Sequence, residues 1–170
     1  MSTTFTLDLS LTQRVAALLI ARKQTLAVSE SSSGGLISAA LLSVPGASAY
    51  FVGGGVIYTA KAREALLGIT PEQMEGMRSA TPEAAKLYAS TVRRNMQAHW
   101  GLAETGATGP AGNRYGDEAG HCCLAVDGSL QSARVLETGS GHRMNNMVAF
   151  ANAALALLEQ TLSDADAQAL

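Results

Sequence analysis

Hydrophobic residues recur along the chain with two different periods, and the helical period marks its two ends. Leu11, Val15, Leu18 and Leu19 fall on one helical stripe with charged residues off it, which predicts an amphipathic helix over about residues 10–23. A second stripe predicts the last helix and has these members: Met147, Ala151, Ala154, Leu155, Leu158 and Leu162. We expect the chain beyond Ser163 to form a frayed tail.

Short apolar segments bounded by glycine, proline or serine predict the strands. There are five of them, at residues 25–28, 50–58, 102–104, 121–126 and 133–138. Helical patterns fall between them, at residues 36–41, at residues 61–67 ending at Gly68, and from Thr81 onward. Helices and strands alternate first and a hairpin follows, which predicts the α/β class: a single-domain, three-layer α/β/α sandwich with a mixed sheet.

A run without charged residues extends from Ser31 to Ala60, 30 positions in all. Its length alone would allow a membrane span. Because serine, glycine and proline interrupt it, we interpret it as the buried centre of a soluble domain, with no membrane partner.

Composition narrows the function classes. Charged residues make up 15% of the chain and hydrophobic residues 47%, which excludes a disordered chain. A net charge of −2 gives no general attraction to nucleic acid. Cys122 and Cys123 are neighbours that would point to opposite faces of a strand, so we expect no disulfide. With no secretory leader in view, a cytoplasmic location is expected.

Three segments are candidates for chemistry. Residues 29–35 (Ser-Glu-Ser-Ser-Ser-Gly-Gly) lie between a predicted strand and helix, where free N–H groups bind anions or stabilise an oxyanion; the serines could also simply cap the helix. Residues 105–112 form a Gly-rich loop that is either a ligand loop or a plain turn. The third candidate is a pair of polar segments: residues 58–63, where Lys61 and Arg63 end the uncharged run, and residues 141–143, where Arg143 could hold a phosphate or carboxylate. The alternative is that these are solvated charges at the ends of elements.

A metal or other cofactor is not expected. The histidines are scattered, and no spacing typical of metal ligands occurs. His121 lies beside the two cysteines in an apolar strand pattern, which favours packing over ligation.

Several of these segments recur in one order that resembles a known family, the C-terminal domain of the competence-damage-inducible protein CinA. The matching segments are residues 30–36, 45–48, 55–58, 66–68, 105–110 and 141–143. The resemblance covers about residues 10–160. It implies one such domain over residues 1–170, with residues 163–170 as the frayed tail, and without the nucleotide-pyrophosphatase domain of two-domain relatives.

The resemblance also implies an activity. Stand-alone domains of this kind are nicotinamide mononucleotide deamidases, which release ammonia and form nicotinic acid mononucleotide for NAD recycling, without a metal. The family's A-E-S-C-T-G-G motif places Ser31 as the nucleophile. Its other motifs imply that Tyr58 belongs to the catalytic set. The substrate would be held by residues of the matching segments: Glu30, Ser32, Ser33, Gly34, Gly35, Ser48, Thr105, Gly106, Gly109 and Arg143. Family members often form homo-oligomers, so we expect one here.

The sequence departs from the family at the catalytic lysine. Five residues after Tyr58, where the Y-S-N-x-x-K motif has lysine, stands Arg63, and arginine is a poor general base. Lys61 could replace it if the segment were extended, because period two would put both side chains on one side. In a helix, two residues turn about 200°, and Lys61 would point elsewhere.

These departures leave three hypotheses. The first is an amidohydrolase acting on nicotinamide mononucleotide. The second is a module of the same fold that binds pyridine nucleotides but is catalytically impaired by Arg63. The third is a deamidase with another substrate, suggested by His142 in place of the motif's aspartate and by Asp117-Glu118 in place of a lysine-proline pair.

Overall fold

Five strands form one mixed sheet in the order β2-β1-β3-β4-β5 in the computed structural model, which describes residues 6–168. The strands are β1 (Leu26–Glu30), β2 (Phe51–Val56), β3 (Trp100–Ala107), β4 (His121–Asp127) and β5 (Ser132–Glu137). β1 pairs in parallel with both β2 and β3, whereas β3, β4 and β5 follow one another antiparallel. The predicted mixed sheet is confirmed.

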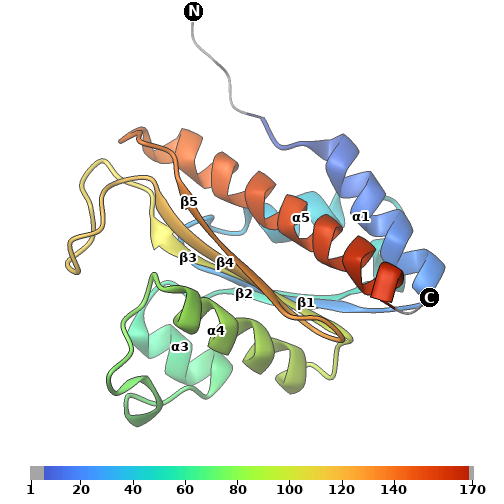
Figure 1. The fold of residues 1–170 in the computed structure, drawn as a ribbon, viewed down its shortest axis with the longest axis horizontal. Coiled ribbons are helices and arrows are strands. Elements are labelled where there is room, and N and C mark those ends of the chain that lie inside the picture. The colour runs from blue at the N-terminus through green and yellow to red at the C-terminus, as the bar shows by residue number, and fades with distance from the viewer. Residues whose placement is uncertain (1–5, 169–170) are drawn as a thin grey trace, which may run out of the picture.

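Helices cover both faces of this sheet. They are α1 (Leu9–Arg22), α2 (Leu36–Leu42), α3 (Ala60–Leu67), α4 (Pro82–Asn95) and α5 (Arg143–Gln168), with short 3-10 turns at Ala47–Ala49 and Glu72–Met74. Figure 1 shows α1 and α5 over one face and α3 and α4 over the other. One core lies under α1, α2 and α5, and a second lies under α3 and α4. The three-layer α/β/α sandwich is therefore confirmed.

Local sequence signals account for the helix ends. The Thr59 and Thr81 side chains accept hydrogen bonds from Ala62 N and Ala84 N, so each caps the helix that follows. Gly68 ends α3 in the left-handed conformation.

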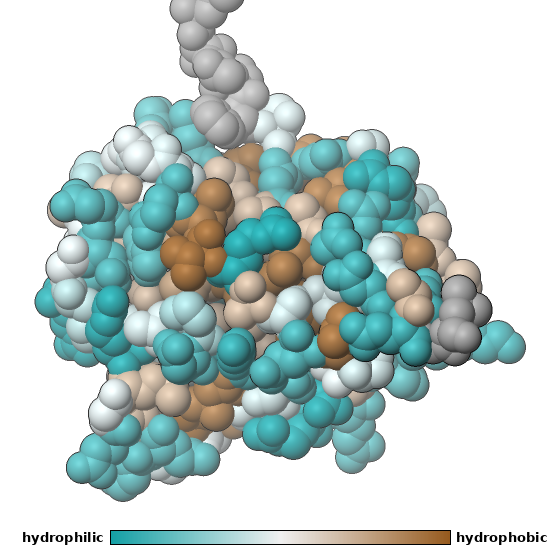
Figure 2. All heavy atoms as spheres, in the orientation of Figure 1, coloured by the Kyte–Doolittle hydropathy of each residue, from teal (hydrophilic) through white to brown (hydrophobic). Residues whose placement is uncertain are grey.

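The space-filling view shows mostly polar residues on the face drawn, with small hydrophobic groups between them (Figure 2).

The predicted fraying after Ser163 is wrong for residues 163–168, which continue α5 as helix. The reason is a long-range contact. The Arg22 guanidinium donates to the carbonyl of Leu162 and pairs with Asp166, which ties this last part of the helix to α1. Residues 169–170 lie outside the described residues.

Cys122 and Cys123 are both buried and free, one in each core, as their adjacency predicted. The charge-free run after Ser31 is divided among α2, a 3-10 turn and β2. Within residues 6–168, no helix has the length and apolarity needed to cross a membrane.

The path of the chain brings two loops to one edge of the sheet. From β1 the chain crosses one face through α2 to β2, then returns over the other face through α3 and α4 to β3. Open α/β sheets bind ligands where the connection changes face, beyond the carboxyl ends of the strands. The loops that leave β1 and β3 lie at this position.

Candidate active site

Two buried carboxylates hold the loop that follows β1. Glu30 accepts hydrogen bonds from Ile37 N and Ser38 N, both at 2.9 Å, at the start of α2. Glu104, on the neighbouring strand β3, accepts from Ser31 N and Ser33 N at 2.9 Å each. Because donors from the backbone surround both carboxylates, the loop has one defined path.

The hydroxyls of Ser32 and Ser33 bond to the buried glutamates, whereas Ser31 lines the cavity. Ser33 Oγ lies 2.8 Å from an oxygen of each glutamate, so its one proton is shared between the two carboxylates, and the Ser32 hydroxyl donates to Glu104. The hydroxyl of Ser31 has no hydrogen-bond partner among residues 6–168, and Ser31 lines a cavity. Thus only one of the three serines presents an unbonded hydroxyl to a possible ligand.

The cavity has a volume of about 590 Å³ and lies beyond the carboxyl ends of β1 and β3. α3, α4, the segment before α4 and the loop after β3 supply the rest of its wall. Its lining residues are Ser31, Ile57, Tyr58, Thr59, Ala60, Arg63, Pro71, Met74, Met77, Ser79, Ala80, Tyr88, Thr105, Gly106, Asn113, Arg114 and Tyr115. A pocket of this size accommodates a nucleotide-sized ligand.

Arg63 and Lys61 lie on different sides of α3. The segment is helical, so the extended alternative that would have aligned them is wrong. Arg63 lines the cavity and its Nη1 donates to Ser79 Oγ at 3.3 Å and Tyr88 Oη at 3.4 Å. Lys61 is exposed and is not part of the lining.

The charged groups of the lining are two guanidiniums, those of Arg63 and Arg114. Among residues 6–168, no carboxylate, histidine or lysine belongs to the lining. Arg114 donates to the Tyr115 hydroxyl at 2.9 Å and lies over its ring, 5.0 Å from the centroid. The hydrogen bond from Arg114 lowers the pKa of Tyr115. Such a cavity favours an anionic ligand.

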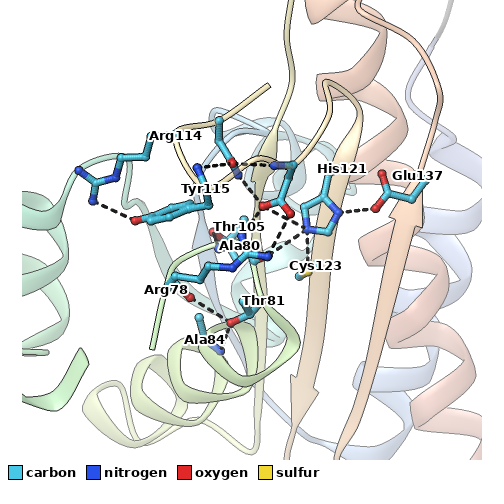
Figure 3. Close-up of polar contacts among 12 residues, drawn as sticks. Arg78, Ala80, Thr81, Ala84, Thr105, Arg114, Tyr115, His121, Cys123 and Glu137 are labelled. Atoms are coloured by element: carbon cyan, nitrogen blue, oxygen red, sulfur yellow. Dashed lines mark hydrogen bonds and ion pairs between the residues drawn. The ribbon is translucent and has the colours of Figure 1, made fainter. Parts of the chain in front are cut away.

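A polar network backs the wall formed by residues 78–80 and the loop after β3 (Figure 3). Arg78 pairs with Asp117 through both its terminal nitrogens, and Asn113 donates to the same carboxylate at 2.8 Å. These donors lower the pKa of Asp117 to about 2. His121, interpreted from the sequence as a packing residue, instead bonds Glu137 and the Ala80 carbonyl.

The remaining predicted residues fall into two groups. Thr105 and Gly106 line the cavity, and Thr105 Oγ1 accepts from Ala80 N at 3.3 Å. Arg143 lies at the rim, where it donates to Gly109 O at 2.7 Å and to Tyr58 Oη at 3.1 Å. It therefore ties the loop after β3 to Tyr58 rather than lining the cavity.

Several predicted substrate-binding residues lie outside the lining. Glu30, Ser32, Ser33, Gly34 and Gly35 form the loop that holds Ser31 and its helix. Ser48 is exposed in the 3-10 turn before β2, at the amino end of that strand, whereas Ser31 follows the carboxyl end of β1. In a single chain it is remote from Ser31.

Sequence reasoning missed Arg114, Tyr115, Tyr88 and Ser79. Arg114 and Tyr115 come shortly after the Gly-rich segment 105–112, and this closeness in sequence could have pointed to them. Tyr88 lies on the buried face of α4, yet it lines the cavity and its hydroxyl accepts a hydrogen bond from Arg63. Ser79 carries no signal in the sequence.

Comparison with known proteins decides the family. The family model for the CinA C-terminal domain matches residues 8–162. The chain belongs to the CinA C-terminal domain family. A CinA-like protein of Desulfosudis oleivorans is 36% identical over 156 residues, which cover 91% of this chain and 38% of that protein. One from Syntrophus aciditrophicus is 39% identical over 158 residues, covering 92% and 37%. The chain thus spans well under half the length of these relatives.

Solved structures agree with the CinA assignment. The competence or damage-inducible protein from Enterobacter asburiae is 26% identical, with a TM-score of 0.85 over 92% of this chain and 99% of that chain. The competence/damage inducible protein CihA from Agrobacterium tumefaciens is also 26% identical, with a TM-score of 0.85 over 95% and 99%. The CinA fold therefore accounts for nearly the whole chain.

Proposed function

We propose that this CinA domain hydrolyses the carboxamide of nicotinamide mononucleotide, with Ser31 as the nucleophile. The observation that carries the proposal is the state of Ser31: its backbone is fixed by Glu104, while its hydroxyl is unbonded within the described chain and lines the cavity. Ser31 also stands at the serine of the family motif. The two cavity guanidiniums match a substrate that carries a phosphate.

The chemistry needs an oxyanion donor beside the nucleophile. Among the amides of Ser31, Ser32 and Ser33, the first and third donate to Glu104. The Ser32 amide has no partner among residues 6–168. We assign this N–H to the tetrahedral oxyanion that forms when Ser31 Oγ attacks the carboxamide carbon. The C–N bond then breaks, ammonia leaves, and water hydrolyses the resulting ester to the carboxylate and free Ser31.

The serine proton requires an acceptor other than Arg63, which stays protonated. The lining offers three phenols, of Tyr58, Tyr88 and Tyr115. Tyr115 has a lowered pKa because Arg114 donates to its hydroxyl. Under the proposal the phenolate form of such a tyrosine, which the neighbouring guanidinium stabilises, takes the serine proton and, as the phenol, returns it to the leaving amine.

A second function, binding a pyridine nucleotide without turnover, is favoured by one specific observation. Within the described part of the chain, no lining residue is a lysine, histidine, aspartate or glutamate, so these residues supply no ordinary general base to the cavity. The positive lining would retain affinity for a phosphate even if catalysis were lost.

Ammonia release from nicotinamide mononucleotide by the purified chain separates the two functions. We expect release that Ser31→Ala abolishes, and Ser31→Ala should still bind the substrate in calorimetric titration because the arginines remain. Thr59→Ala, which alters a lining hydroxyl at the cap of α3, is the matched control. If the natural chain releases no ammonia but the Arg63→Lys variant does, the binding function is favoured.

If the natural chain neither binds nor cleaves nicotinamide mononucleotide, both functions are wrong. A panel of other small amides then tests whether the site accepts a different substrate.

A further inference from the structure

His121 faces hydrogen-bond acceptors on both sides of its ring. Its Nδ1 meets the Glu137 carboxylate on β5, and its Nε2 lies 2.9 Å from the Ala80 carbonyl oxygen (Figure 3). A neutral imidazole carries one N–H and can donate to only one of them. Only the imidazolium donates to both.

The charged groups around the ring balance when it is protonated. Glu137 and Asp117 are the carboxylates, with Asp117 Oδ2 at 3.9 Å from Nε2; Arg78 is the second cation, bonded to Asp117. On β4 itself, Cys123 Sγ lies 3.5 Å from Nε2. Burial by itself lowers the pKa of His121, but the bonds to Glu137 and Ala80 and the negative charge of both carboxylates outweigh it and raise that pKa.

Ala80, whose carbonyl oxygen faces the Nε2 of His121, has an unusual backbone conformation. Ala80 has φ of 58°, the left-handed region that alanine rarely adopts. Two bonds hold it there: its N–H donates to Thr105 Oγ1 at 3.3 Å, and its carbonyl accepts from His121. Ala80, Thr105 and Ser79 all line the cavity, and Ser79 contacts Arg63.

We propose that His121, as an imidazolium bridging Glu137 and the Ala80 carbonyl, positions the Ser79–Ala80 wall of the cavity and, through it, Thr105. His121 touches no ligand in this scheme, since it is not part of the lining, and acts through Ala80. When the ring loses its proton it keeps one N–H; the carboxylate of Glu137 is the stronger acceptor and retains it, so the bond to Ala80 is lost and the wall is released. The link to turnover rests on the proposed function, whereas the protonation and the coupling to Ala80 do not.

Nuclear magnetic resonance of the full chain tests the protonation directly. We expect the ring nitrogens of His121 to show imidazolium shifts at pH 6.5 and to titrate above that pH, with the Ala80 amide resonance following the same midpoint. Glu137→Gln should lower the midpoint because it removes the facing charge. A ring that is already neutral at pH 6.5, or an Ala80 amide that ignores its titration, overturns the proposal.

A matched pair of substitutions tests the positioning. In His121→Gln the side-chain amide nitrogen reaches the place of Nε2 and can still donate to Ala80; in His121→Asn it reaches only the place of Nδ1. We expect His121→Gln to bind nicotinamide mononucleotide within about twofold of the natural chain and without its pH dependence. His121→Asn should bind about tenfold more weakly, the effect of one lost hydrogen bond.

Comparable losses in both variants, at comparable thermal stability, would overturn the positioning role. If the natural chain binds no nicotinamide mononucleotide, the proposed function fails, while the Ala80 titration still decides whether His121 controls this wall.

Discussion

The two walls of the cavity are held in different ways. The Ser31 wall depends on Glu30 and Glu104, which are both buried and are surrounded by donors from the loop. The opposite wall depends on the ion pair of Arg78 with Asp117 and on the buried His121, whose partner Glu137 is exposed, as is Arg78. The first arrangement fixes Ser31 through the core of the sheet. The second ends in exposed charged groups, so it is the wall that a change of pH can alter.

The largest expected effect comes from removing the buried carboxylate of the Ser31 wall. Glu104→Ala leaves the Ser31 and Ser33 amides without an acceptor, and we expect it to lower the free energy of unfolding by about 3 kcal/mol or more. Glu137→Ala on the opposite wall is the matched control; its carboxylate is mostly exposed, and we expect about 1 kcal/mol or less. Denaturant titration of both variants measures the difference, and equal losses would contradict the comparison.

A smaller effect is expected from two glycines that adopt positive φ, one in the loop that carries Ser31 and one in the loop after β3. Gly34 has φ of 66°, and a Cβ there would lie 2.8 Å from Met147 Cε; Gly116 has φ of 92° and open space around it. Both substitutions to alanine should cost about 1–2 kcal/mol for the left-handed backbone. Gly34→Ala should cost slightly more because Met147 must move. Thermal unfolding compares them, and a costlier Gly116→Ala would refute this ranking.

A third expected effect is a pH dependence confined to the opposite wall. The pKa of Asp117 is lowered to about 2, so it contributes stability that is present above pH ~4, its unfolded range, and is lost as the pH falls toward 2. Asp117→Asn should flatten this part of the stability curve. Glu118→Gln, an exposed neighbour, should leave the curve as it is. An unchanged acid limb in Asp117→Asn would show that other carboxylates dominate it.

Local signals made most of the fold predictable from the sequence. Threonine caps, the Gly68 terminus and apolar periodicity each act within a few residues, and the helices and strands that they predicted are present. The end of α5 was mispredicted because Arg22, far away in sequence, holds it.

The candidate site was harder to predict from the sequence, because its contacts also join residues that are far apart in the chain. The motif at residues 29–35 pointed to a loop that contributes Ser31 to the cavity, but it did not show which serine hydroxyls are bonded, because that depends on Glu104 on another strand. Likewise His121 has the pattern of a core residue within β4, and only its cross-strand neighbour Glu137 and the distant Ala80 make it a charged bridge.

The bond from the Ser31 amide to Glu104 also has a consequence for folding. It joins residues 73 positions apart and requires β1 to be paired with β3. Contacts of such separation form late, because the intervening chain must first give up its freedom. A partly folded chain therefore has the complete motif in its sequence but no anchored Ser31, and the Ser31 loop takes its final form only when β1 and β3 have paired.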